Sequence, residues 1–252
     1  MSVHRRERVL EILRERGFVR LHDLEAEFPD YSSMTLRRDI EFFENIGEVQ
    51  RVRGGAKYIG SLNGSEDIYE IREIKNKAAK EHIASVAAGY AETGCSIYLD
   101  SGTTGMMIAK LLPDTPYFIL TSGPNVAVEI AKKFKPSVTL VGGQMNRVTL
   151  SVSGTQSLDF IKNFNIETAF VAASAFSPED GFTVGNSSEC ELKRAVVKKA
   201  KKVIMLCDSA KFGKSMPYTF AALDEVDVLI TEKQPCDEIA QAAEKAGTAI
   251  IW

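Results

Sequence analysis

The sequence is poor in the residues that build disulfides, metal centres and membrane spans. Its 252 residues include four cysteines and three histidines, with no CxxC pair and no Cys/His cluster. Cys95, Cys190, Cys207 and Cys236 are scattered. Such scatter favours reduced thiols in a cytoplasmic protein over disulfides or metal. No apolar run approaches the ~18 residues that a membrane-spanning helix needs, and the start, MSVHRRERVLEIL, lacks the apolar core of a signal peptide.

Neither sign of charge dominates the chain. The formal net charge is −3, and 44% of residues are hydrophobic and 26% charged, which are ordinary values for a globular protein. This balance neither indicates nor excludes a nucleic-acid-binding protein, because a local basic face matters more than the total. The length allows one large domain, or a small domain followed by a larger one.

Residues 1–58 have the pattern of three short helices followed by a hairpin. Apolar residues recur at helical spacing in three segments that end near Gly17, Pro29 and Gly47. Either Ser32 or Ser33 can cap the third helix, because a serine oxygen accepts from the free first-turn amides. The residues expected to face the core are Val9, Ile12, Leu13, Leu21, Leu24, Phe28, Leu36, Ile40 and Phe43. The segment EVQRVRGGAKYI then alternates as a hairpin does, and the order predicts a winged helix-turn-helix domain.

The pattern changes after this domain. Residues 59–75 contain Gly, Ser and Asn and then many charges, which is typical of a linker running into a connecting helix. Between residues 76 and 252, short apolar runs alternate with helical patterns, which indicates an α/β domain whose mostly parallel sheet is covered on both faces. The expected strands are 96–99, 117–120, 138–141, 169–173, 203–206, 228–230 and 248–251, and the expected helices are 106–112, 126–134, 191–200 and 238–246.

The third predicted helix is polar and basic on the side away from its apolar stripe. The residues on that side are Ser33, Thr35, Arg37 and Arg38. They lie in the half of a recognition helix that enters the major groove, where arginine reads guanine or holds phosphate. The hairpin adds the cations Arg51, Arg53 and Lys57, which can grip the DNA backbone. On charge alone a solvated face is an equally good explanation, because Asp39, Glu41 and Glu44 follow; the order of helices and hairpin favours DNA.

The strongest local feature of the second part is IYLDSGTTGMMIAKLL. A strand ends at Asp100, and a turn of small residues leads into a helix. Backbone amides at that helix start, with hydroxyls beside them, form an anion site suited to a phosphate. A structural explanation is equally strong, because Ser101 or Thr103 can cap the helix while Gly102 supplies the turn. The Gly-Lys-Ser/Thr of a Walker loop is absent.

Similar turns follow two more predicted strands, in LTSGPN and LVGGQ. Ligands of open α/β sheets gather at the carboxyl ends of strands, so these turns can share one crevice with the first. Their candidate residues are Thr121, Ser122, Gly142 and Gly143. Lys193 and Lys211 are the cations that could complete a phosphate site, although an isolated lysine is more often simply solvated.

The head resembles the DeoR family of bacterial transcription regulators. The family pattern is Ser, two variable residues, Thr, a branched apolar residue and Arg-Arg-Asp-Leu. It maps onto Ser32, Thr35, Leu36, Arg37, Arg38, Asp39 and Ile40, and the family's wing, Arg-x-x-Gly-Gly-Ala, maps onto Arg51, Gly54, Gly55 and Ala56. One departure is the turn FPDYSS, which is one residue longer than usual and could tilt the recognition helix.

The second part resembles the sensor domain of the same regulators, which is similar in fold to ribose phosphate isomerase. The matching motifs are LDSGTT, LVGG, GFT…ECELKR and DSAKFG. The resemblance implies a phosphorylated sugar or related metabolite, with its phosphate at Ser101, Gly102, Thr103 and Thr104 and the two lysines nearby. The family commonly has Thr-Asn-Ser where this chain has Thr121-Ser122-Gly123, and Gly-Ala-Asp-Gly where it has Ala172-Ala173-Ser174-Ala175. An aspartate there could accept bonds from sugar hydroxyls, whereas Ser174 is neutral and shorter. An atypical effector is therefore the alternative to a typical sugar phosphate.

An enzyme is the main alternative to a regulator. An aldose–ketose isomerase needs a positioned base and a group that stabilises an enediolate. Its candidate carboxylates would be Asp100, Asp180, Glu189, Glu191 and Asp208, and each has a structural role that explains it as well. No Ser-His-Asp set is visible, and scattered His4, His22 and His82 make a catalytic metal unexpected. No cofactor is expected.

The sequence therefore predicts a cytoplasmic transcriptional repressor of sugar-metabolism genes. It would bind double-stranded operator DNA as a homo-oligomer, either a dimer or a tetramer, and respond to a phosphorylated sugar. An activator built on the same scaffold remains the alternative within the family.

Overall fold

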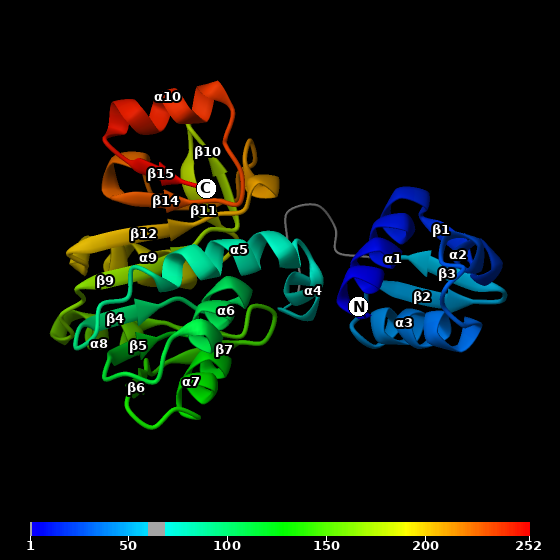
Figure 1. Ribbon diagram of the computed structural model, residues 1–252, viewed down its shortest axis with the longest axis horizontal. Coiled ribbons are helices and arrows are strands. Elements are labelled where there is room, and N and C mark those ends of the chain that lie inside the picture. The colour runs from blue at the N-terminus through cyan, green and yellow to red at the C-terminus, as the bar shows by residue number, and fades with distance from the viewer. Residues whose placement is uncertain (1, 60–68) are drawn as a thin grey trace. The chain divides into compact units, whose positions relative to one another are not determined.

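The computed structural model describes residues 2–59 and 69–252. Within it the chain forms two compact units, Met1–Lys77 and Ala78–Trp252 (Figure 1). Most of the linker predicted at 59–75 falls on residues 60–68, which lie outside the described residues.

The first unit is a winged helix-turn-helix. Its elements are α1 (Ser2–Arg16), β1 (Phe18–Arg20), α2 (Leu21–Glu27), α3 (Ser33–Asn45), β2 (Val49–Val52) and β3 (Gly55–Tyr58). Every residue predicted to face the core of the three helices is buried or packs against that core. Ser32 is the N-cap of α3 and accepts a hydrogen bond from the Thr35 amide at 3.3 Å. Gly17 and Gly47 adopt positive φ after α1 and α3, which ends both helices.

Two features of this unit differ from the sequence pattern. The wing is a three-stranded sheet in the order β1-β3-β2, because the short strand β1 adds to the predicted hairpin. In addition, α4 (Tyr69–Ile74) belongs to the first unit, whereas the sequence pattern placed residues 59–75 outside the head, as a linker and the start of a connecting helix. Ile71 and Ile74 lie three residues apart on one face of α4 and are buried in the core of the head.

Gly55 allows β1 and β3 to approach closely, and its replacement by alanine should destabilise the head. A Cβ at this position would lie 2.2 Å from the Val19 carbonyl oxygen, which is backbone and cannot turn away. We expect Gly55→Ala to lower the free energy of unfolding of the head by about 1–3 kcal/mol, as overpacking does. Urea unfolding followed by circular dichroism measures this. Gly54→Asn is the control, because Gly54 faces open space and asparagine tolerates its positive φ; equal losses in both variants would contradict the steric explanation.

The second unit is built around a seven-stranded parallel sheet. Its strand order is β15-β14-β12-β9-β4-β5-β6, and each neighbouring pair is parallel. The strands are β4 (Ser96–Leu99), β5 (Phe118–Thr121), β6 (Ser137–Leu140), β9 (Thr168–Ala172), β12 (Lys202–Leu206), β14 (Val228–Ile230) and β15 (Ala249–Ile251). All seven apolar runs that the sequence pattern marked as strands lie in this sheet.

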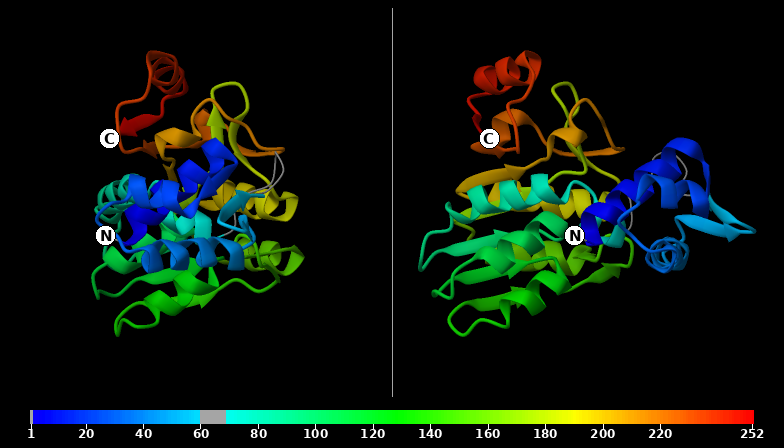
Figure 2. Two further views of the ribbon diagram at one scale, coloured as in Figure 1. Left: turned by 90° about the vertical axis from the view of Figure 1, so that its right-hand side faces the viewer. Right: turned by 45° about the vertical axis from the view of Figure 1, so that its right-hand side comes forward.

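Helices cover both faces of the sheet (Figures 1 and 2). On one face, α5 (Lys77–Ala88), α6 (Thr103–Leu111) and α7 (Pro124–Ile130) bury their apolar sides. On the other face, α8 (Thr155–Asn163), α9 (Ser187–Lys199) and α10 (Asp237–Ala246) do so. The α/β prediction is confirmed, including the cover on both faces.

Short antiparallel elements that the sequence pattern did not mark decorate the sheet. β7 (Gln144–Asn146) pairs with β8 (Ser151–Ser153), while β10 (Ala175–Ser177), β11 (Gly181–Val184) and β13 (Tyr218–Ala221) form a small second sheet. The one-turn 3₁₀ helices η1 (Ser209–Lys211) and η2 (Leu223–Glu225) complete the unit. The Val152 amide donates to the Ser122 carbonyl at 2.8 Å, so β8 lies beside the carboxyl end of β5.

The strand order locates the crevice in which a ligand can bind. From β4 the chain proceeds outward through β5 and β6, and it then returns to place β9 on the other side of β4 before moving outward through β12, β14 and β15. The direction of winding therefore reverses between β4 and β9. In open α/β sheets the crevice for ligands lies at such a switch point, outside the carboxyl ends of the strands.

Candidate functional site

The outer face of α3 presents two exposed cations. Arg37 and Arg38 are exposed, and so are Arg53 and Lys57 in the wing. Within residues 2–59 and 69–252, no carboxylate forms an ion pair with any of these four side chains. Residues 1–58 contain as many Lys and Arg as Asp and Glu. The head therefore has no excess of positive charge, and what sets this face apart from the rest of the head is that its cations lack ion pairs with described carboxylates.

The other three residues predicted to bind DNA are Ser33, Thr35 and Arg51, and two of them are held by contacts within the head. Ser33 is exposed at the start of α3, whereas the half-buried Thr35 has its hydroxyl 3.0 Å from the Ser32 hydroxyl. The exposed Arg51 guanidinium forms an ion pair with Glu44, and the Arg51 amide donates to the same carboxylate at 3.1 Å. Arg51 is therefore held against α3, while Arg53 extends from the wing without such a restraint.

The solvated-face explanation for α3 does not hold for Asp39. The sequence pattern counted Asp39 among the acids of an exposed face, but its side chain is only 1% exposed and lies against Arg5 and Arg6 of α1. Sequence reasoning also missed Arg20, which is exposed on β1 opposite Gly55 at the wing turn. A three-residue strand has too few residues for a periodic signal.

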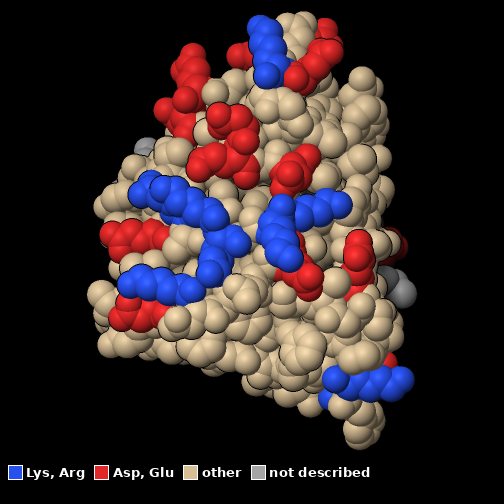
Figure 3. Space-filling model, turned by 90° about the vertical axis from the view of Figure 1, so that its left-hand side faces the viewer, with Lys and Arg blue, Asp and Glu red and all other residues tan. Residues whose placement is uncertain are grey.

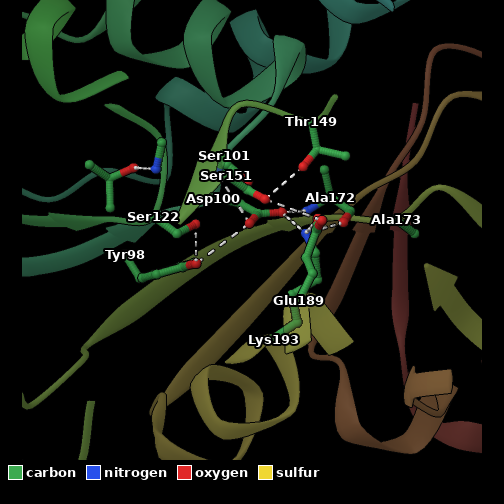
Figure 4. Close-up of polar contacts among 12 residues, drawn as sticks. Tyr98, Asp100, Ser101, Ser122, Thr149, Ser151, Ala172, Ala173, Glu189 and Lys193 are labelled. Atoms are coloured by element: carbon green, nitrogen blue, oxygen red, sulfur yellow. Dashed lines mark hydrogen bonds and ion pairs between the residues drawn. The ribbon is translucent and has the colours of Figure 1, made fainter. Parts of the chain in front are cut away.

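The sensor unit holds a buried group of charges at the switch point between β4 and β9 (Figure 4). Asp100 follows β4 and is 1% exposed. One carboxylate oxygen accepts from the Ser101 amide at 3.0 Å and the other from the Ala172 amide at 2.9 Å. Asp100 thus ties the carboxyl end of β4 to that of β9.

Lys193 and Glu189 reach the same point from α9. The Lys193 ammonium forms an ion pair with Asp100, donates to the Ala172 carbonyl at 2.9 Å and lies 3.5 Å from Glu189. Glu189 precedes Lys193 by four residues, so both project from one face of α9. Both are buried. The Ser151 hydroxyl of β8 donates to Glu189 at 3.4 Å.

Hydroxyl groups surround these charges. Tyr98 lies two residues before Asp100, on the face of β4 that α9 covers, because side chains alternate along a strand. Its hydroxyl is 2.9 Å from the Ser122 hydroxyl. Burial, and then the charge of Asp100, raise the pKa of Tyr98 well above its usual value, so the phenol keeps its proton. Ser122 therefore joins the network through Tyr98.

The turn after Asp100 is not explained by side-chain capping. The N-cap of α6 is Gly102, which has a φ of 103° and no capping side chain. Ser101, Thr103 and Thr104 are buried at this turn. The first intrahelical bond runs from the Met106 amide to the Gly102 carbonyl, so the earlier amides have no acceptor within the helix. This half of the structural explanation is wrong, whereas Gly102 does supply the turn.

Of the remaining predicted site residues, two lie at the carboxyl end of β9 and one lies at the start of α7. Lys211 donates to the Ala173 carbonyl at 2.6 Å and lies 3.4 Å from Asp208, which places it at the carboxyl end of β9. Ser174 is half-buried there, and its amide donates to the Thr183 carbonyl at 3.0 Å. The Thr121 hydroxyl accepts from the Gly123 amide at 3.0 Å and so shapes the start of α7.

Gly142 and Gly143 are exposed beyond the end of β6, two strands away from β4. Gly143 packs closely on the Ser153 carbonyl, where a Cβ would lie 2.4 Å away. In the described part of the chain, no hydrogen bond joins either glycine to the Asp100 network. Gly143 therefore allows close packing beside β8, whereas a Cβ on Gly142 would meet open space.

The carboxylates considered for an enzyme are all engaged or exposed. Asp180 accepts from Ser177 and Ser215, and Glu191 is exposed on α9. Asp100, Glu189 and Asp208 lie beside lysines.

Among the residues that the structure describes, no group of three His, Cys, Asp or Glu side chains is placed to hold a metal ion, and no helix is long and apolar enough to cross a membrane. The four cysteines are free, and burial raises the pKa of Cys207 to about 12.

Comparison with known proteins identifies both units. Residues 5–61 match the DeoR-like helix-turn-helix domain, and residues 75–233 match the DeoR C-terminal sensor domain. The chain belongs to the DeoR family. The DeoR description assigns a helix-turn-helix domain to the unit that carries α3 and a sensor domain to the unit that carries the Asp100 network.

Relatives in the DeoR family match over nearly the whole chain. The HTH-type transcriptional regulator GlpR of Haloferax volcanii is 29% identical over 100% of this chain and 98% of its own. A protein described as an aga operon transcriptional repressor, from Escherichia coli O157:H7, is 30% identical over 98% of this chain and 92% of its own. Among solved structures, ribose 5-phosphate isomerase A of Methanocaldococcus jannaschii is 14% identical over 55% of each chain, with a TM-score of 0.41.

Proposed function

We propose that this chain is a transcriptional repressor whose operator affinity is set by a phosphorylated sugar or related metabolite. It would act as a homo-oligomer on double-stranded DNA, because one three-helix head covers only a single half-site. The observation that carries the proposal is the buried charge network beside an uncapped helix start at the switch point of the sensor sheet. A domain that served only for oligomerisation would not need such a buried charge network.

DNA would be held by the cations of α3 and the wing. Arg37 and Arg38 would enter the major groove, and Arg53, Lys57 and Arg20 would hold phosphates on either side. No carboxylate of the described residues pairs with these side chains, so they can reach DNA without first breaking an ion pair. By contrast, Figure 3 shows a face on the left of Figure 1 where basic and acidic side chains lie side by side. That mixture favours the head as the DNA-binding surface.

The phosphate of the effector would lie at the start of α6. The amides of its first turn point along the helix axis, and the hydroxyl-bearing residues of this turn, Ser101, Thr103 and Thr104, are buried. The sugar end would then extend over the carboxyl end of β9 toward Lys211 and Ser174. Because Ser174 is a hydroxyl and not a carboxylate, it can both donate and accept a hydrogen bond there.

Effector binding would act by population shift. A metabolite that prefers one arrangement of the oligomer lowers operator affinity by its differential binding to the two arrangements. A coupling free energy of roughly 1–3 kcal/mol corresponds to a change in operator affinity of about 5–150-fold. The coupling is reciprocal, so operator DNA must weaken metabolite binding by the same factor.

Thr103→Tyr should abolish the metabolite response and leave DNA binding intact. The tyrosine ring would occupy the space in front of the first-turn amides, whereas α3 and the wing lie in the other unit. A thermal-shift panel of phosphorylated sugars on the full chain tests this, because a ligand at 100 times its dissociation constant stabilises by about 2.7 kcal/mol.

Thr155→Tyr is the matched control for this test. Thr155 also follows a glycine N-cap at the start of a helix, α8, but it is exposed and outside the Asp100 network. The control should keep the full thermal shift. A phosphorylated sugar that stabilises wild type and Thr103→Tyr equally would place the ligand elsewhere.

A further inference from the structure

Asp39 connects α3 to α1 through both of its carboxylate oxygens. One oxygen accepts from Arg5 Nε at 2.5 Å. The other accepts from Arg5 Nη2 at 3.1 Å and from Arg6 Nε at 2.9 Å. The Asp39 side chain is 1% exposed and that of Arg5 is 10% exposed, so this arrangement is screened from solvent.

Two aromatic rings hold the same arginines. The Arg5 guanidinium lies 4.6 Å from the centre of the Tyr31 ring, in the turn before α3. The Arg6 guanidinium lies 4.1 Å from the centre of the Phe42 ring, on α3 itself. Guanidinium groups stack favourably on aromatic faces. Arg5 and Arg6 therefore contact α3 at its entry, at Asp39 and at Phe42. Tyr31 belongs to the lengthened turn FPDYSS, so the same contacts also restrain that turn.

We propose that Asp39 is a positioning residue that fixes the rotation of α3 and thereby aims Arg37 and Arg38. This rests on the DNA-binding role proposed above. Successive residues of a helix are about 100° apart around its axis, so a rotation that moves Asp39 moves its two neighbours by the same angle. The apolar attraction that buries Leu36, Ile40 and Phe43 is not directional. A carboxylate that receives two N–H groups from one planar guanidinium is directional, so it sets the rotation of α3 more sharply.

A merely structural role predicts a different result from a positioning role. Buried ion pairs contribute less to stability than their geometry suggests, and they can serve to select one arrangement. If Asp39 only stabilised the head, its loss would weaken binding to every DNA sequence through the unfolded fraction. If it aims the arginines, specific binding falls while non-specific binding does not, because removing one negative charge favours phosphate contacts.

The test compares Asp39→Asn with Glu41→Gln in the full-length chain. Glu41 is exposed on the same helix two residues away, so the control makes the same change of charge without touching α1. Fluorescence anisotropy would measure binding to a duplex selected by the wild-type chain from a random pool, and to an unrelated duplex. For Asp39→Asn we expect roughly a tenfold or greater loss on the selected duplex, comparable to one mismatched base pair. Binding to the unrelated duplex should be unchanged or tighter, and Glu41→Gln should lose nothing on either.

Arg6→Gln provides a second, milder variant if Asp39→Asn does not fold. Its side chain is 31% exposed, and the contacts between Arg5 and Asp39 remain in place. It should lose part of the preference for the selected duplex while its melting temperature stays close to that of wild type. Equal losses on both duplexes, or no loss in a folded Asp39→Asn chain, would overturn the proposal. A wild-type chain that selects no duplex would instead contradict the DNA-binding role itself.

Discussion

Replacement of Lys193 by methionine should lower the free energy of unfolding of the sensor unit by about 3–5 kcal/mol, the usual cost of removing one partner from a buried ion pair. Asp100 and Glu189 would then share a buried site without the ammonium that lies between them. Trp252 is the only tryptophan and follows β15 in the sensor unit, so its fluorescence during urea unfolding reports on this unit alone.

Lys198→Met is the control for this effect. Lys198 lies on the same helix but is exposed, and surface changes of this kind usually remain within about 0.5 kcal/mol. A loss below about 1 kcal/mol for Lys193→Met would mean that water reaches the two carboxylates, because a buried unpaired charge costs several times more.

Arg38→Ala should weaken binding to the selected duplex by about 1–3 kcal/mol if Arg38 reads a base, with relaxed specificity at one position. If Arg38 contacts only phosphate, the loss should be uniform across sequences and the dependence on salt should become shallower. Anisotropy titrations at several salt concentrations, with single-base variants of the duplex, separate the two cases.

Arg8→Ala serves as the control for Arg38→Ala. It removes an exposed arginine of the head that already pairs with Glu11 on α1 at 2.9 Å. Its binding should stay near that of wild type. Unchanged binding by Arg38→Ala would be incompatible with α3 as the recognition helix.

The elements that the sequence predicted are those with a local signal. A strand buried on both faces reads as a short apolar run, and the same apolar signal marked the partly exposed edge strands β6 and β15. The helices of the head showed their stripes for a similar reason. The burial pattern of β1, exposed-buried-exposed, contains a single core residue, Val19, and gives no period. β7 and β10 are equally short. β13 has four residues, but its partner β11 lies far earlier in the chain.

The site was less predictable because its partners are distant in sequence. Asp100 could be singled out as the end of a strand, and Lys193 as a cation, but they are 93 residues apart. Only the fold shows that they form an ion pair. The spacing of Glu189 and Lys193 was a usable signal for a pair on one helix face, but it does not reveal that Ser151 and Asp100 complete the network. Asp39 was misjudged for the same reason, because its partners come from α1.

The most direct test is the affinity of the full-length chain for its selected duplex with and without each phosphorylated sugar. We expect at least one of them to change the dissociation constant by about 5–150-fold. Thr103→Tyr should remove this change, and Thr155→Tyr should retain it. A dissociation constant that stays the same with every sugar phosphate, in a chain that binds the duplex specifically, would contradict control by a phosphorylated metabolite.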